Sequence, residues 1–142
     1  MEISAIAGLS VLVVEDMYLI GASLAAGLEQ AGAHVIGPIG TVREALAALD
    51  PLPDLATLDI QLDRETSFPV ADELVRLGIP FVFATATGSS IPAAHRERIV
   101  CAKPYTIIAI LTALHRALAG AGISNPPVMA ATIVTQRLVL SA

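Results

Sequence analysis

Short apolar runs recur along this chain, and longer stretches with helical spacing separate them. The runs, each long enough for one buried strand, cover residues 10–14, 34–36, 55–58, 80–84 and 98–101. Helices are predicted over residues 18–31, from Thr41 onward, around 70–77, briefly after Ser90, and over 106–118. Strands and helices that alternate pack as a parallel sheet covered on both faces. The pattern therefore predicts an α/β fold, a five-stranded parallel sheet in a doubly wound sandwich.

Two capping signals mark helix ends. Gly32 suits the left-handed position that follows the first predicted helix. Thr41 and Glu44 have the spacing of a capping box, in which the first residue begins a helix and the second completes its hydrogen bonding.

The composition of the 142 residues supports one domain with a large apolar core. Hydrophobic residues make up 55% of the chain and charged residues 15%, which excludes an intrinsically disordered chain. The formal net charge is −5, and the eight lysines and arginines form no cluster. Binding to nucleic acid or to an anionic membrane is therefore not expected.

Three further features bear on location. Cys101 is the only cysteine, so neither an internal disulfide nor a C-x-x-C motif can form. No stretch supplies the roughly 20 unbroken apolar residues of a membrane-spanning helix. The N-terminus carries Glu2 in place of the basic region of a secretory signal. We therefore expect a cytoplasmic protein without membrane insertion.

Polar residues gather where the predicted strands end. The residues that follow the first, third, fourth and fifth strands are Glu15, Asp16, Asp59, Thr85 and Lys103. The ends of parallel strands meet at one edge of the sheet, and such sheets bind their ligands there. We therefore expect these side chains to lie close together.

This set has the chemistry of a phosphoryl-binding site. Its three carboxylates repel each other unless a cation is present. Mg²⁺ suits such ligands, with Asp16 and Asp59 bound directly and Glu15 acting through water. Lys103, the only lysine in the chain, and the Thr85 hydroxyl would bind phosphoryl oxygens, while one carboxylate acts as nucleophile.

Four short motifs stand at these strand ends: VLVVED, LD, FAT and KP. Over residues 10–118 the combination resembles the receiver domain of bacterial two-component response regulators. The resemblance implies a (βα)5 flavodoxin-like sandwich, as the strand pattern also predicts. It implies a phosphoacceptor switch, active at most in its own aspartyl phosphorylation and dephosphorylation, that signals by protein contact or phosphate relay.

The resemblance also assigns roles to single residues. Asp59 is implied to accept a phosphoryl group from a histidine kinase or histidine phosphotransfer protein. Thr85 is implied to be the switch hydroxyl, and Lys103 the partner of the acidic site and of the phosphoryl oxygens. The residues implied to hold Mg²⁺ are Glu15, Asp16, Asp59 and, through its main-chain carbonyl, Gln61.

A narrower likeness is to the FAT GUY group of stand-alone receivers. The stretches that carry it are PFVFAT at residues 80–85 and ETSFPVAD at residues 65–72. Ala86 replaces the glycine that follows FAT in that group, and Thr87 and Gly88 depart from its usual run. Receivers also carry an aromatic switch residue three positions before the lysine. Val100 stands there, with Tyr105 as the candidate substitute.

Two other functions stay open. A haloacid-dehalogenase-type phosphatase also uses a strand-end aspartate, Mg²⁺ and a lysine. That family needs an acid where this chain has Gln61, and places its nucleophile after the first strand. A receiver-like interaction module that is never phosphorylated is the other, and it would bind its partners equally well with Asp59→Asn.

The remaining polar residues have structural interpretations. His34, His95 and His115 are widely spaced and are expected to be surface or half-buried residues without a metal. Cys101, on a predicted buried strand, is expected to be inert.

Three acidic residues near the third strand are also not assigned to the site. Asp63 is expected to be a solvated loop residue. Glu65 and Asp72 are expected to help cap the helix that follows them.

The chain divides into a lead-in at residues 1–9, a receiver domain at 10–118 and an apolar extension at 119–142. Residues 125–127, Asn-Pro-Pro, interrupt the extension, and residues 128–140 beyond them carry a single charge, Arg137. Such a segment is too apolar for a solvated tail. We expect it to dock on a receiver surface and to contribute to self-association.

Self-association and signalling have a second candidate surface. It comprises the short helix after Ser90, the strand at 98–101 and the helix at 106–118. By the resemblance, this face would bind an effector protein or a second copy of the chain.

Overall fold

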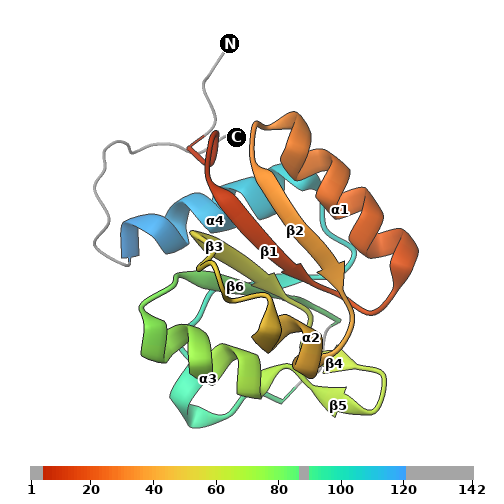
Figure 1. Ribbon diagram of the computed structural model, residues 1–142, viewed down its shortest axis with the longest axis vertical. Helices are drawn as coiled ribbons and strands as arrows, with labels where there is room; N and C mark the ends of the chain where they lie inside the picture. The colour runs from red at the N-terminus through yellow and green to blue at the C-terminus, as the bar shows by residue number, and fades with distance from the viewer. Residues whose placement is uncertain (1–4, 87–89, 121–142) are drawn as a thin grey trace.

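The computed structural model describes residues 5–86 and 90–120. Five parallel strands form one sheet in the order β2-β1-β3-β6-β7 (Figure 1). The strands are β1 (Ser10–Val14), β2 (His34–Ile39), β3 (Leu55–Leu58), β6 (Phe81–Thr85) and β7 (Val100–Ala102). The predicted α/β fold, a parallel five-stranded sheet with flanking helices, is therefore confirmed.

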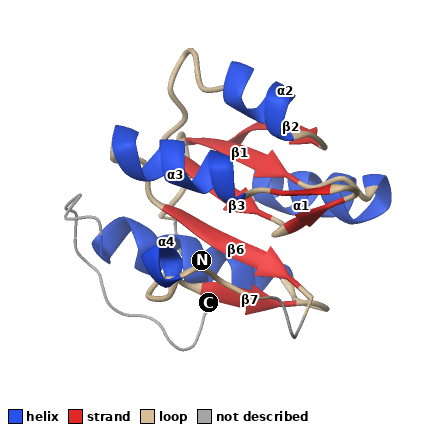
Figure 2. Ribbon diagram, turned by 90° about the horizontal axis from the view of Figure 1, so that it is seen from below, coloured by secondary structure: helices blue, strands red, loops and turns tan. Residues whose placement is uncertain are grey.

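Helices cover both faces of the sheet (Figure 2). The described part of the chain holds α1 (Tyr18–Gln30), α2 (Val42–Ala47), α3 (Phe68–Leu77) and α4 (Ile107–Gly120). Helices α1 and α4 pack on one face, and α2 and α3 pack on the other. The doubly wound arrangement follows from this division.

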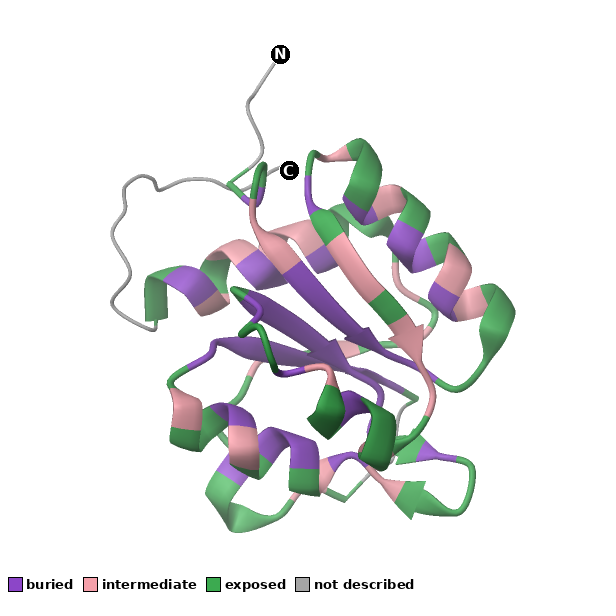
Figure 3. Ribbon diagram, in the orientation of Figure 1, coloured by how far each residue is buried: buried purple, intermediate pink, exposed green. Residues whose placement is uncertain are grey.

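The central strands are buried on both sides, which explains why they appear as continuous apolar runs (Figure 3). In β1, Val11 and Val13 belong to the core beneath α1 and α4, while Leu12 and Val14 belong to the core beneath α2 and α3. Neighbouring residues point to opposite faces of a strand, so one short run supplies both cores.

Both predicted capping signals are present. Gly32 has a φ of 98° and directly follows Ala31, the C-cap residue of α1. The Thr41 hydroxyl accepts a hydrogen bond from the Glu44 amide at 3.2 Å and lies 3.1 Å from the Glu44 carboxylate. Helix α2 therefore begins where the sequence predicts.

The structure differs from the predictions in the segment that precedes α3 (Phe68–Leu77). A two-stranded hairpin, β4 (Gln61–Leu62) and β5 (Glu65–Thr66), replaces the predicted loop. Glu65 accepts a hydrogen bond from the Val42 amide at 3.0 Å, so it caps the preceding α2 and the expectation that it caps the following helix is wrong. The hairpin directs this side chain back toward α2.

The helix predicted after Ser90 is a single 3₁₀ turn, η1 (Ala93–His95). Pro92 precedes the turn, and the His95 amide bonds back to the Pro92 carbonyl at 2.9 Å. The turn ends at His95, whose side chain is buried.

Some predictions fall on residues outside the described ranges. These are the departures at Thr87 and Gly88, the Asn-Pro-Pro interruption, and the apolar extension beyond residue 120. Over residues 5–86 and 90–120, no helix is both long enough and apolar enough to cross a lipid bilayer.

Candidate phosphoryl and metal site

The carboxyl ends of the strands bring the predicted site residues together. The Lys103 ammonium nitrogen lies 2.8 Å from Glu15 Oε1 and 3.2 Å from Asp59 Oδ2. Glu15 is only 4% exposed and Asp59 only 6%. The two carboxylates therefore share one cation, largely out of contact with water. We call Glu15, Asp16, Asp59 and Lys103 the acidic edge.

The sheet itself holds these residues in register. The Asp59 amide donates to the Val14 carbonyl at 2.9 Å, which ties the end of β3 to β1. The Lys103 amide donates to the Thr85 carbonyl at 2.8 Å, which ties the end of β7 to β6. Each functional side chain thus starts from backbone that is fixed to a neighbouring strand.

The electrostatics reflect the crowding of charge. Burial, together with the neighbouring Asp59, raises the pKa of Glu15 to about 7 against the opposing effect of Lys103. Burial lowers the pKa of Lys103, but Glu15 and Asp59 together raise it above its ordinary value. The acidic edge therefore stabilises the charged ammonium of Lys103, and Glu15 keeps its proton to a higher pH than an ordinary glutamate. Both effects are expected of a site in which negative charge exceeds positive charge.

The carboxylates fit a hard divalent cation. Glu15, Asp16 and Asp59 each offer an oxygen, and these atoms lie within 4.8 Å of one another. Asp16 is exposed, so a bound ion could keep water ligands on that side. Oxygen donors and retained waters are what Mg²⁺ requires, and the chemistry of this donor set meets the requirement.

The side chain of Gln61, on β4, makes its hydrogen bonds within the hairpin and not with the three acidic residues. Its side-chain amide donates to the main-chain oxygens of Asp63 and Glu65, at 3.0 and 3.1 Å. The side chain thus stabilises the hairpin, and its main-chain carbonyl stays a predicted metal ligand. Asp63 is exposed, as expected.

The aromatic residue next to the site is Tyr105. Val100, at the position of the missing aromatic, is 43% exposed on the edge strand. Burial and the nearby charges of Glu15 and Asp59 raise the pKa of Tyr105 to about 12. Its hydroxyl is buried and has no hydrogen-bond partner among the residues described. The replacement of the aromatic switch by Tyr105 stays a prediction.

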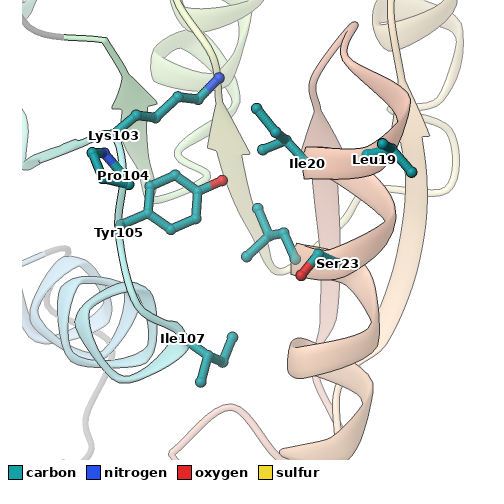
Figure 4. Close-up of a pocket in the computed structure, with 8 residues that line it drawn as sticks. Leu19, Ile20, Ser23, Lys103, Pro104, Tyr105 and Ile107 are labelled. Atoms are coloured by element: carbon teal, nitrogen blue, oxygen red, sulfur yellow. The ribbon is translucent and has the colours of Figure 1, made fainter.

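A pocket of about 480 Å³ adjoins Lys103 and opens between α1 and the segment that leads into α4 (Figure 4). In the close-up, the Tyr105 hydroxyl points across this space toward α1. The residues that line it are Leu19, Ile20, Ser23, Leu24, Lys103, Pro104, Tyr105 and Ile107.

His95 is a buried polar residue that the sequence analysis does not predict. His95 is 2% exposed, so the expectation of a surface or half-buried histidine is wrong. Three phenylalanine rings surround the imidazole at centroid distances of 6.0 to 6.2 Å. These rings, which with His95 form what we call the His95 cage, belong to Phe68, Phe81 and Phe83.

The partner of the caged imidazole is Asp72. The His95 Nε2 atom lies 2.7 Å from Asp72 Oδ1. Asp72 lies within α3, so the expectation that it caps this helix is wrong. No sequence motif indicates this contact, since the two residues come from a helix and a connecting segment 23 positions apart.

The other histidines agree with the predictions, whereas the strand that carries Cys101 is not buried as predicted. His34 is exposed, and His115 is half-buried, with its pKa lowered by burial. Cys101 is free and half-buried on β7, and burial raises the pKa of its thiol. A thiol with a raised pKa is a poor nucleophile.

No protein-family model matches the chain, and no curated protein matches it. Among solved structures, SdrG from Sphingomonas melonis Fr1 is 36% identical, with 81% of this chain and 97% of that chain covered and a TM-score of 0.67. The PhyR response-regulator receiver domain from Erythrobacter litoralis is 27% identical, with coverages of 89% and 99% and a TM-score of 0.71.

The non-phosphorylated HemR receiver domain from Leptospira biflexa is 26% identical, with 83% of this chain and 98% of that chain covered and a TM-score of 0.67. The similarity to SdrG extends over nearly all of that chain, and the named receiver domains share the fold. The chain therefore belongs to the receiver-domain family of response regulators.

Proposed function

We propose that this chain is a cytoplasmic, single-domain response regulator of the FAT GUY type. It accepts a phosphoryl group on Asp59, with Mg²⁺, from a histidine kinase or a histidine phosphotransfer protein. The observation that carries the proposal is the acidic edge, where one ammonium lies within 3.2 Å of two buried carboxylates. A third carboxylate lies at the solvent-exposed side of the same cluster.

The chemistry is a phosphoryl transfer between two side chains. A carboxylate oxygen of Asp59 attacks phosphorus, the bond from phosphorus to the donor's imidazole nitrogen breaks, and that nitrogen keeps the electron pair. Lys103 neutralises the phosphoryl oxygens as they approach Asp59. Mg²⁺ held by Glu15, Asp16, Asp59 and the Gln61 carbonyl would supply further positive charge to these oxygens.

The response to phosphorylation begins at Thr85. Its hydroxyl moves toward the new phosphoryl group, and its carbonyl is already bonded to the Lys103 amide at 2.8 Å. A shift at the end of β6 is therefore passed directly to the end of β7. Two populations of the face formed by η1, β7 and α4 would follow, and an effector or a relay partner would distinguish them.

The stand-alone type is supported by the extent of the similarity to SdrG, of which 97% is covered. We propose that the receiver domain comprises residues 10–118, preceded by a lead-in at residues 1–9 and followed by the apolar extension at 119–142.

Intact mass after incubation with acetyl phosphate tests the proposal. We expect a gain of one phosphoryl group per chain that requires Mg²⁺ and is absent from Asp59→Asn. A matched control is Asp63→Asn, on the exposed hairpin turn, which should be phosphorylated normally. Continued release of phosphate from simple esters would instead favour a phosphatase. No gain from acetyl phosphate or from phosphorylated kinases would favour an interaction module.

A further inference from the structure

Exposed apolar side chains concentrate at one place on the described surface. Leu19 is 80% exposed and Tyr18 is 75% exposed, both in the first turn of α1. Met17, Ile107 and Ile108 are 57%, 36% and 55% exposed. The last two begin α4, which packs beside α1. Leu19 and Ile107 line a pocket between the two helices, and the other three residues lie within two positions of them in the sequence. We call these five residues the apolar rim.

The rim borders the pocket of about 480 Å³ between α1 and α4 (Figure 4). Most residues that line this pocket are apolar, with Lys103 at the end nearest the acidic edge. We call the pocket and its rim the α1–α4 groove. A contiguous apolar surface of this kind on a small domain marks a site that another segment covers.

We propose that residues 128–140 of the same chain cover the α1–α4 groove. Nine of these thirteen residues are apolar, and Arg137 is the single charge. Such a segment loses little by leaving water and gains by contact with an apolar surface. An apolar groove and an apolar segment of one chain thus complement each other.

The chain is long enough to reach the groove. Helix α4 has 14 residues, so Gly120 lies about 20 Å along the helix from Ile107. The seven residues from 121 to 127 span up to about 23 Å when extended. They alone can return the chain along α4, which leaves residues 128–140 free to occupy the groove.

A different location, as a sixth parallel strand beside β7, is disfavoured by handedness. The crossover from β1 to β2 passes through α1, on the same face as α4, and moves toward one edge of the sheet. A crossover from β7 through α4 to a strand beyond it would move the opposite way on that same face. It would therefore be left-handed, and crossovers of parallel strands are right-handed in about 98% of cases.

Amide hydrogen exchange of the full chain tests the docking without depending on phosphorylation. The variant Ile133→Asp with Val134→Asp places two charges in the segment and touches no residue of the described core. Ser141→Asp with Ala142→Asp is the matched control, because it adds the same charge outside the segment. Wild type and both variants are compared at several concentrations, with their mass in solution.

We expect exchange to rise about tenfold or more at residues 17–24 and 103–108 in the first variant only. Exchange in helices α2 and α3, on the opposite face of the sheet, should stay as in wild type. Unchanged exchange in the groove would overturn the inference. Protection that is lost on dilution, together with a fall from dimer to monomer mass, would also overturn it, because a second copy would then cover the groove.

Discussion

The acidic edge and the His95 cage each bury an ionisable side chain, but they do so with opposite surroundings. At the acidic edge, Lys103 lies between the carboxylates of Glu15 and Asp59, which are 4% and 6% exposed. In the cage, three aromatic rings enclose His95, and its one carboxylate partner, Asp72, has a side chain that is 70% exposed.

The acidic edge is therefore held together by the balance of its charges, whereas the His95 cage is held together by the packing of its rings. Removal of one charge from the acidic edge leaves its partners buried and unbalanced, which is costly. Removal of the polar function from the cage leaves a shape that an apolar ring can still fill. The two regions should therefore respond differently to apolar replacements.

The largest effect is expected from Lys103→Met, which keeps much of the side-chain length and removes the charge. Glu15 and Asp59 would then face each other without a cation. We expect the free energy of unfolding at pH 8, without Mg²⁺, to fall by about 3 kcal/mol. Urea unfolding measures this, with Lys103→Arg as the charge-conserving control. An equal loss in both variants would show that shape, and not charge, matters at this position.

A smaller effect is expected from His95→Ala, which leaves a cavity among the rings of the cage. We expect a loss of about 2 kcal/mol. His95→Phe should stay within about 1 kcal/mol of wild type, because an aromatic ring refills the space. Thermal and urea unfolding of the pair measure the difference. If His95→Phe destabilises the protein as much as His95→Ala, the cage depends on its hydrogen bond to Asp72.

The pH dependence of stability should reveal the acidic edge. The pKa of Glu15 is about 7 in the folded protein and ordinarily 4.5, so the folded state binds this proton more tightly. The stability that Glu15 contributes is thus fully present below about pH 4.5 and is lost as pH rises to about 7. Glu15→Gln should remove this dependence, as measured by unfolding without Mg²⁺ at pH 5 and pH 8.

Mg²⁺ should offset the same loss, since it replaces the missing proton with a metal charge. A Glu15→Gln protein that keeps the full pH dependence would assign that dependence to other groups.

The smallest effect is expected from Asp72→Asn. Because the Asp72 side chain is largely exposed, its pairing with His95 should contribute only about 0.5 kcal/mol. Glu97→Gln, an exposed charge beyond the same 3₁₀ turn, is the matched control. Unfolding in urea would contradict the packing account of the cage if Asp72→Asn cost as much as His95→Ala.

The acidic edge could be predicted because strand order and chemistry point to the same place. The residues just after strands β1, β3 and β7 are Glu15, Asp59 and Lys103, and parallel strands bring their carboxyl ends to one edge. The apolar runs also located the three central strands, since a strand buried on both faces contains little else. In both cases the local sequence pattern is enough to predict where the residues lie in the folded sheet.

The His95 cage could not be predicted in this way. Phe81 and Phe83 lie two residues apart on β6 and therefore share one face of the sheet. Nothing in the sequence indicates that a 3₁₀ turn places His95 against these two rings. Glu65 was assigned to the wrong helix for the same reason, because the hairpin that turns it toward α2 depends on long-range packing. A contact between side chains that are far apart in the chain produces no periodic pattern in the local sequence, so the sequence does not reveal it.

The most direct measurement locates the phosphoryl group on the full chain. After reaction with acetyl phosphate and Mg²⁺, borohydride reduces an aspartyl phosphate to homoserine, and peptide mass spectrometry then finds the changed residue. We expect the change at Asp59 and at no other acidic residue. A change at Asp16 or Asp63, or a stable phosphohistidine in place of any reduced aspartate, would contradict the assignment of the acidic edge as a phosphoacceptor site centred on Asp59.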